Sequence, residues 1–198
     1  MKIDPRRIKI TTAPAAEPVT TTEAKLHCRV DHATEDDIFT RLIEVARNQC
    51  EQISGRAFVT RTYTAMLDRW PGHCFELPYA PLAGITSIKY YDDAGSAADT
   101  VSSANYYVDT NSEPGRVALV SGADWPSTTL RDINGVEIIY TAGYGNAAAV
   151  PDQYKQAMLL LIGHLYENRE SVAVQQGIGM VQVPMAVEWL LQTDRIFN

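Results

Sequence analysis

The chain has few cysteines and no long apolar segment. Its 198 residues include three cysteines, Cys28, Cys50 and Cys74, without a CxxC spacing. An odd number at wide spacing predicts no disulfide framework, so reduced thiols in a cytoplasmic setting are expected. No apolar stretch reaches the roughly 18–20 residues needed to cross a bilayer. Residues 1–9 are polar and basic with no apolar segment after them, which predicts neither a signal peptide nor a membrane partner.

Positive charge is also scarce. The chain carries 17 Lys and Arg against 24 Asp and Glu, a formal net charge of -7. Because contacts to phosphate need Lys and Arg, this balance argues against a non-specific nucleic-acid binder. It does not exclude a place beside DNA, since an acidic surface lets a duplex pass without sticking.

The common catalytic signatures are missing. The sequence has no Walker A, GxSxG, HExxH or EF-hand pattern. Gly143-Tyr144-Gly145 is too short to cradle a phosphate and predicts a turn between a strand and a helix. We therefore expect no catalytic residue and no cofactor. One alternative is a small enzyme that uses His164 and Glu167, one helical turn apart, as an acid–base pair; the plainer interpretation is a hydrogen bond at a helix tip.

Two sets of residues raise the question of a metal. His27-Cys28 and His73-Cys74 could form a zinc site, but adjacent side chains point apart on a strand or a helix. Thiols in the core and histidines at its edge are expected, with no metal. Five carboxylates in turns would be solvated by default, with a cation site as the alternative. They are Asp92, Asp93, Asp99, Asp109 and Glu113.

What the sequence does contain is typical of a folded protein, with 45% hydrophobic and 21% charged residues.

Thr20 and Glu23 form a capping-box pattern that predicts a helix over 21–29. Thr34 and three acidic residues predict a second helix start, and Gly55 its end. One apolar stripe recurs along this second helix at spacings of three and four. It consists of Ile38, Leu42, Val45, Ala46, Gln49, Cys50 and Ile53.

The period then changes to two. Tyr63, Ala65 and Leu67 share one face of a predicted strand. Further short strands are separated by turn clusters rich in Gly, Pro and Asp. The expected strands cover residues 59–70, 74–77, 85–91, 106–109, 116–119 and 136–142.

A third long helix follows Pro151, which suits a first helical turn. Its predicted buried face holds Tyr154, Ala157, Met158, Leu161, Ile162 and Leu165. It ends in a polar tip, residues 166–170.

Residues 171–183 carry no charge but are apolar and broken by glycine. They are either a disordered loop or a segment that orders only against a partner, because contiguous exposed apolar surface marks interaction sites. A last short helix is predicted over 185–195.

These elements predict an α+β fold. Two N-terminal helices and the long helix of the C-terminal half would form a small helical bundle, with a β-rich block inserted between them. We expect an N-terminal arm over residues 1–18, a helical core over 19–57 and 146–170, the β-rich block over 58–145, and a C-terminal arm with a short helix over 171–198.

Several motifs, in this order, resemble the head–tail connector proteins, also called adaptor or head-completion proteins, of long-tailed phages and prophages. The most specific are YTAGYG (140–145), VP (150–151) and YENRE (166–170). The others are EAKLHCRVD (23–31), the helix over 36–56, LDRWP (67–71), LPYAPL (77–82), ITSIKYYD (85–92), PGR (114–116), WP (125–126) and the tail over 183–195. The resemblance spans about residues 19–196.

The resemblance implies a structural virion protein without catalytic residues. Such proteins form rings, typically of twelve subunits, that dock below the portal, extend the DNA channel and link head to tail. The implied partners are the portal protein, a tail-side neck protein and other copies of the chain. Genomic DNA would pass through the lumen without specific binding. The implied location is the head–tail interface of the virion, after assembly in the host cytoplasm. An isolated chain would be a monomer or a weak oligomer.

The resemblance also implies which residues make contacts. Its C-terminal tail would grip the portal, which agrees with the uncharged segment. The expected portal-binding residues are Val172, Val174, Ile178, Met180, Val181, Val183, Trp189, Leu190, Ile196 and Phe197. The expected ring contacts are Tyr166, Glu167, Arg169 and Glu170. The main alternative is a stopper or tail-completion protein of the phage neck, which would bind tail-side components and not the portal.

Overall fold

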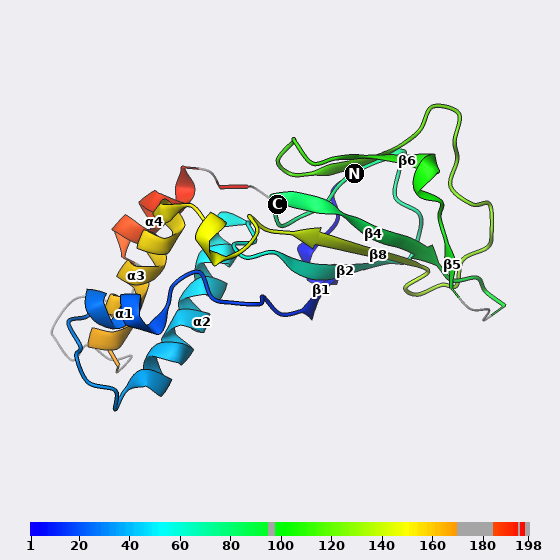
Figure 1. Ribbon diagram of the computed structural model, residues 1–198. Helices are drawn as coiled ribbons and strands as arrows, with labels where there is room; N and C mark the ends of the chain where they lie inside the picture. Colours follow the sequence, from blue (N-terminus) through cyan, green and yellow to red (C-terminus); the bar gives the residue numbers. More distant parts are fainter. Residues whose placement is uncertain (95–97, 170–183, 194, 197–198) are drawn as a thin grey trace, which may run out of the picture. The chain divides into compact units, whose positions relative to one another are not determined.

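The computed structural model describes residues 1–94, 98–169, 184–193 and 195–196. The chain divides into two compact units. The sheet unit contains the described residues of Met1–Ala15, Gly55–Tyr144 and Ile196–Asn198. The helical unit contains those of Ala16–Ser54 and Gly145–Arg195. The predicted α+β class is confirmed (Figure 1).

The sheet unit contains two antiparallel sheets. The larger has the strand order β1-β2-β8-β4-β5 and the smaller the order β3-β7-β6. The strands of the larger sheet are β1 (Ile8–Thr12), β2 (Arg61–Leu67), β4 (Leu82–Tyr90), β5 (Asp99–Thr100) and β8 (Val136–Ala142). Those of the smaller are β3 (Cys74–Glu76), β6 (Tyr106–Asp109) and β7 (Arg116–Leu119). Short 3-10 helices precede β1 (η1, Pro5–Arg7) and β6 (η2, Ser103–Asn105).

The core of this unit is continuous across both sheets. Alternate residues of β2 and β8 point inward, as their period of two predicted. Their buried side chains join those of β3, β6 and β7 in one apolar cluster. Aromatic rings dominate it: Tyr63 stacks on Tyr79 and Tyr140 at centroid distances of 4.7 and 5.4 Å. This continuous apolar layer makes the sheet unit a two-layer structure.

Most of the predicted strands are present, and three of them, β6, β7 and β8, have the predicted bounds. Two strands were missed. The segment expected only as an extended arm contributes β1, which pairs with β2 over Ile8–Thr12. The two-residue strand β5 pairs with β4.

The YTAGYG motif contains the last residues of β8 and the turn that follows this strand. Gly143 has a φ of 134°, and a Cβ there would lie 2.5 Å from the backbone N and Cα of Thr60. Only glycine fits such a close approach in this backbone region without displacement. The Gly143 amide donates to the Pro81 carbonyl at 2.9 Å, and the Tyr144 amide donates to Phe58 at 3.0 Å. The glycine is therefore a structural requirement, and the turn predicted here is confirmed.

The helical unit contains four α-helices. These are α1 (Thr21–His27), α2 (Asp36–Ser54), α3 (Asp152–Glu167) and α4 (Met185–Gln192), with a short 3-10 helix η3 (Ala147–Ala149) before α3. The capping box at Thr20 and Glu23 is confirmed, with the Glu23 amide 3.2 Å from Thr20 Oγ1. Gly55 follows α2 with a φ of 71°, as expected for a C′ glycine.

The predicted apolar stripe on α2 is confirmed at Ala46 and Cys50, and elsewhere the buried side of the helix lies one position further along the chain. The buried positions are Phe39, Ile43, Ala46, Arg47, Cys50, Glu51 and Ser54. Val45 is exposed, and Ile38, Leu42 and Ile53 are only partly buried. The sequence offers Ile38-Phe39, Leu42-Ile43 and Val45-Ala46 as neighbouring pairs, so two adjacent stripes are equally apolar there. The packing of the unit selects the second stripe.

The buried face of α3 agrees with the prediction for Tyr154, Ala157, Met158, Leu161 and Ile162, while Leu165 is only partly buried. α2 and α3 pack against each other, and both also contact α1 and α4. α2 and α3 therefore form the centre of the unit, and α1 and α4 each lie against both of them.

Candidate interaction surfaces

The polar tip of α3 is tied back to the start of α2. The hydroxyl of Tyr166 donates to Glu35 Oε2 at 2.5 Å, and the guanidinium of Arg169 donates to Glu35 Oε1 at 2.6 Å. The Tyr166 ring stacks on Phe39 at 4.9 Å, and the Arg169 guanidinium lies 4.6 Å from the Tyr166 ring centre. Each oxygen of the Glu35 carboxylate thus has its own donor from the tip.

This pairing shifts the ionisation of both partners. The hydrogen bond from Tyr166, followed by that from Arg169, lowers the pKa of Glu35. The same hydrogen bond raises the pKa of Tyr166, because ionised tyrosine could not donate to a carboxylate. The contact of Glu35 with Tyr166 and Arg169 is called the clasp below. Its hydrogen bonds are strongest when the Glu35 carboxylate is ionised.

Two of the four expected ring-contact residues, Tyr166 and Arg169, thus make intramolecular contacts. Arg169 nevertheless keeps a side-chain exposure of 51% and can face a neighbour at the same time. Glu167 is exposed, and Glu170 lies outside the described residues. Their role between subunits stays a prediction.

The alternative acid–base pair does not assemble. His164 Nδ1 lies 3.4 Å from the Asn168 side-chain amide, and within the described chain His164 forms no hydrogen bond with Glu167. The Asn168 side chain also donates to the His164 carbonyl at 2.8 Å. These contacts close the C-terminal end of α3, as in the plainer interpretation.

α4 has one buried face and one exposed face. Val187 and Leu191 are fully buried at 0% exposure, whereas Met185 and Trp189 are 84% and 73% exposed. Positions 185 and 189 are one turn apart, so they share the outer face of the helix. This outer face is the α4 face, defined by Met185 and Trp189.

The expected portal-binding residues that the structure describes differ in their exposure. Trp189 is exposed, Leu190 is half-buried and Ile196 is buried. Only Trp189 of these three offers a large apolar surface to a partner. The remaining seven lie outside the described residues; they are Val172, Val174, Ile178, Met180, Val181, Val183 and Phe197.

A second exposed apolar residue lies on α1. Leu26 is 78% exposed, although Ala24, two positions earlier, is fully buried. Residues two apart on a helix point roughly in opposite directions, which explains the contrast. The sequence analysis predicted the helix over 21–29 but did not single out Leu26. The 100° helical rotation, applied to Ala24 as the inward residue, would have identified it.

An open cleft of about 640 Å³ lies in the sheet unit. Its walls are formed by the first residues of the chain and by the segment after β2, joined by an ion pair of 2.6 Å between Arg7 and Asp68. Leu67 and Trp70 form its apolar part. Sequence analysis missed it, because the first residues were expected to lie free of the sheet.

Two of the acidic turn residues, Asp109 and Glu113, form ion pairs with arginines. Asp109 accepts from Arg116 at 2.7 Å and from Ser112 at 2.6 Å, and Glu113 accepts from Arg56 at 2.6 Å. The hydrogen bonds from Ser112 and Arg116 hold the pKa of Asp109 far below its usual range. Among the described residues, no group of three His, Cys, Asp or Glu side chains is arranged to hold a metal ion.

The three thiols are free and differ in access: Cys28 is half-buried, Cys50 buried and Cys74 exposed. Burial raises the pKa of Cys50 to about 12. Within the described part of the chain, none of the helices is long and apolar enough to span a membrane.

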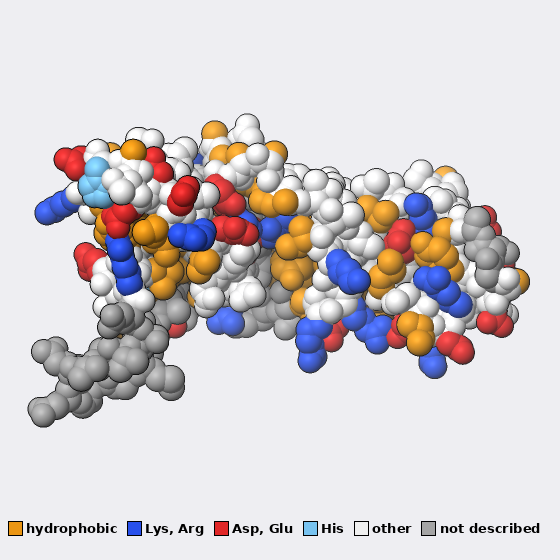
Figure 2. All heavy atoms as spheres, turned by 90° about the horizontal axis from the view of Figure 1, so that it is seen from below, with side chains coloured by type: hydrophobic (Ala, Val, Ile, Leu, Met, Phe, Trp, Pro, Cys, Tyr) orange, Lys and Arg blue, Asp and Glu red, His pale blue; other side chains and the backbone are white. Residues whose placement is uncertain are grey.

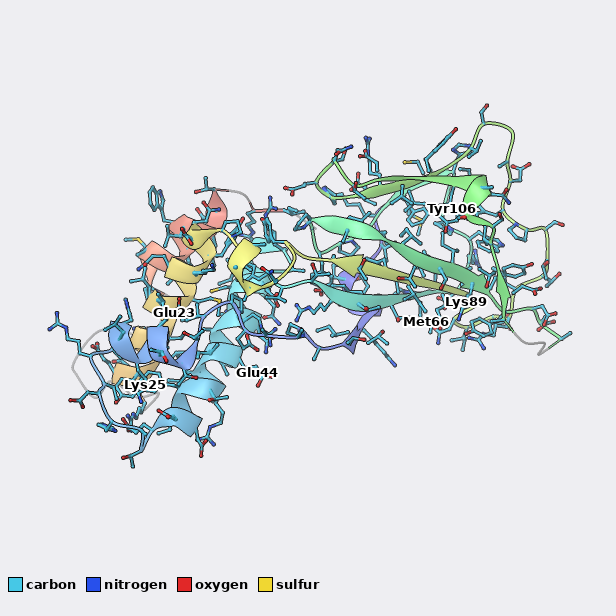
Figure 3. All side chains as sticks on the ribbon, viewed as in Figure 1. Glu23, Lys25, Glu44, Met66, Lys89 and Tyr106 are labelled. Carbon is cyan, nitrogen blue, oxygen red and sulfur yellow. The ribbon has the colours of Figure 1, made fainter. Side chains whose placement is uncertain are left out.

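The net charge of the chain is -7, and charged side chains of both signs share its surface. On the face shown in Figure 2, Lys and Arg side chains are interspersed with Asp and Glu side chains. On α1, Lys25 pairs with Asp36 at 2.6 Å, and Glu23 accepts from Thr20; Figure 3 labels Glu23 and Lys25 on this helix. A mixed surface of this kind does not form a track for a phosphate backbone.

No family model matches the chain, and no curated protein matches it either. Solved structures do match it over almost its whole length. A chain in the neck of an empty gene transfer agent (GTA) particle, computed with C6 symmetry, has a TM-score of 0.77 and 25% identity, with 96% of each chain covered. A chain in the neck of the native GTA particle, computed with C12 symmetry, has a TM-score of 0.73 and 25% identity at the same coverage.

A third match, to a chain in the virion of the native gene transfer agent particle, has a TM-score of 0.73 and 24% identity, again over 96% of both chains. The likeness covers both the sheet unit and the helical unit. The chain therefore shares its fold, over both units, with chains of gene transfer agent particles.

Proposed function

We propose that this chain is a structural protein of the neck of a phage or phage-like particle, where it acts as a head–tail connector. The observation that carries the proposal is the likeness to chains of GTA particle necks over 96% of both partners. A match of this extent includes the inserted sheets as well as the helices. The order of motifs in the sequence supports the same role independently.

In this proposal, copies of the chain form a ring below the portal and extend the DNA channel. The symmetry with which the neck structures were computed, C6 and C12, supports a ring. The net charge of -7 suits a lumen through which DNA passes without specific binding. The protein would act by assembly, at the head–tail interface of the virion, and we assign no reaction and no cofactor to it.

For the connector role, the partners are the portal on one side and a tail-side neck protein on the other. We assign the portal contact to residues 171–183, because this segment is rich in apolar residues and carries no charge. A stopper or tail-completion role is the second candidate, because connector, stopper and tail-completion proteins all occupy the neck.

Electron cryo-microscopy of portal-containing particles tests the position. We expect density for this chain in a ring directly below the portal. Its absence from the neck would overturn the proposal, and a position below another ring would favour the stopper role.

A pull-down with the portal protein tests the partner. Removal of residues 171–198 would also remove the buried Val187 and Leu191 of α4, so substitutions are preferable. We expect replacement of Val172, Val174 and Val181 by serine to reduce portal capture at least about tenfold, which corresponds to about 1.4 kcal/mol. Ile133→Ser is the matched control, since Ile133 is 71% exposed in the sheet unit. Equal capture by both variants would contradict the assignment.

A further inference from the structure

The helical unit exposes large apolar side chains at two sites, one on α4 and one on α1. α4 presents Met185 and Trp189, which are 84% and 73% exposed. α1 presents Leu26, which is 78% exposed. α1 and α4 each pack against α2 and α3, so the two apolar sites lie on different helices around the same central pair.

Among the described residues, both apolar sites stay exposed. Val187 and Leu191 already supply the inward contacts of α4, and Ala24 supplies that of α1. Exposed Trp and Met on one short helical face are unusual for a surface without a partner, since Trp and Met are enriched in the buried centres of interfaces.

Each apolar site has one charged neighbour without an ion pair in the described chain. On α4 this is the exposed Glu188, next to Trp189. At α1 it is the exposed Arg29, three positions after Leu26, although the exposed Glu23 and Asp31 also lie near this helix. A pair between Glu188 of one copy and Arg29 of the next would join opposite charges.

Two different, complementary patches on one subunit are what a head-to-tail contact requires. A two-fold dimer uses the same patch twice, whereas a closed ring of more than two copies joins one patch to another. The occupant that fits the α4 face is therefore a second copy of the same chain.

We infer that the α4 face of one copy, with Met185 and Trp189, packs against α1 of the next copy around Leu26, and that this head-to-tail contact closes the ring. The inference rests on the proposed function, and it assigns Trp189 to the contact between copies and not to the portal. Leu26 joins the interface as a residue that sequence analysis did not identify.

Cysteine cross-linking tests the contact without removing its apolar side chains. Thr22 lies one turn before Leu26, Thr193 lies one turn after Trp189, and both are exposed. A chain with Thr22→Cys and Thr193→Cys, in which Cys28 and Cys74 are replaced by serine, is treated with a flexible bismaleimide. The treatment is applied to the purified chain at high concentration and to assembled particles. Circular dichroism checks that the fold is retained.

We expect a ladder of dimers, trimers and higher species from the double-cysteine chain, and only monomers from either single-cysteine chain. Adding Trp189→Ser should reduce the ladder about tenfold or more, the effect typical of a central interface residue. Val45→Ser is the matched control, because Val45 is 51% exposed on α2 and lies in neither patch.

Three results would overturn the inference. A dimer from Thr193→Cys alone would show a two-fold contact of α4 with itself. A cross-link from α4 to a different polypeptide in particles would assign the face to another neck component. No ladder from either sample would show that the α4 face and the Leu26 site do not meet. If the ladder is absent but microscopy finds the chain in the neck, only this inference fails; if the chain is missing from the neck, the proposed function fails.

Discussion

The sheet unit and the helical unit are stabilised in different ways. The sheet unit encloses one apolar cluster between two layers, with stacked rings of Tyr63, Tyr79 and Tyr140 at its centre. The helical unit has an apolar core and also a buried ion network around Arg47. Arg47 donates to Glu17 at 2.7 Å and to Glu51 at 3.3 Å, although the Arg47 side chain is only 5% exposed.

This difference shows where each unit is vulnerable. A layer of apolar side chains loses stability when volume is removed, whereas a buried ion network loses it when one partner is removed and the other charge is left uncompensated. Polar ties also respond to pH, which an apolar layer does not.

The largest effect is expected in the sheet unit. Phe75 on β3 is fully buried, with 0% exposure, and its ring lies 6.3 Å from that of Trp125. We expect Phe75→Ala to lower the free energy of unfolding by about 4 kcal/mol, because it leaves a cavity between the sheets. Denaturant unfolding followed by tryptophan fluorescence measures it.

The control for Phe75 lies in the same small sheet. Tyr107 on β6 is 66% exposed, so Tyr107→Ala should change the free energy of unfolding by no more than about 0.5 kcal/mol. Similar losses for both variants would mean that the two sheets do not enclose a common core.

The second effect is expected in the helical unit. Arg47→Met should lower the free energy of unfolding by about 3 kcal/mol, since Glu51, with a side-chain exposure of 4%, keeps a buried charge without the arginine beside it. Arg41→Met on the exposed side of the same helix is the control, with an expected change of no more than about 0.5 kcal/mol. Thermal unfolding followed by circular dichroism compares them, and a larger loss in the control would refute the buried network as a determinant of stability.

The smallest effect concerns the clasp at the tip of α3. Because the folded pKa of Glu35 is lowered, its contribution is complete above the usual glutamate pKa of 4.5 and is lost as the pH falls through the lower folded value. Glu35→Gln should therefore be less stable than the parent at pH 7, with the difference shrinking below about pH 4.5.

Thermal unfolding of both proteins between pH 7 and pH 3 provides the measurement. Asp37→Asn is the matched control, since Asp37 is exposed near the start of the same helix. A difference between the parent and Glu35→Gln that stays constant with pH would show that Tyr166 and Arg169 do not depend on the charge of Glu35.

The sequence predicted the sheet unit better than the details of the helical unit. β6, β7 and β8 have the expected bounds because their alternation is bounded by clear turn residues. β1 was missed because Ile8 and Ile10 are its only large apolar residues, and its existence depends on pairing with β2, more than 50 positions further along the chain. Local pattern carries no information on such a distant partner.

Candidate sites were predicted less well, for a related reason. Trp189 was expected to bind the portal because the resemblance places that contact in the C-terminal tail. The structure shows that Trp189 is 73% exposed, and its partner stays a prediction. The use of Tyr166 and Arg169 in a clasp with Glu35 could not, since it depends on α3 ending beside the start of α2. Leu26 was overlooked because its exposure follows from which side of α1 meets the other helices.

The outer edge of β1 affects whether copies of the chain can pair through their strands. β1 is the terminal strand of the larger sheet and pairs on one side with β2. Free edges of this kind invite strand-to-strand polymerisation. Here the strand is short, carries the exposed Lys9, and breaks register between Ile10 and Thr12. These three features are known deterrents to edge pairing, so the sheet is protected against fibril-like growth even where many copies are crowded together.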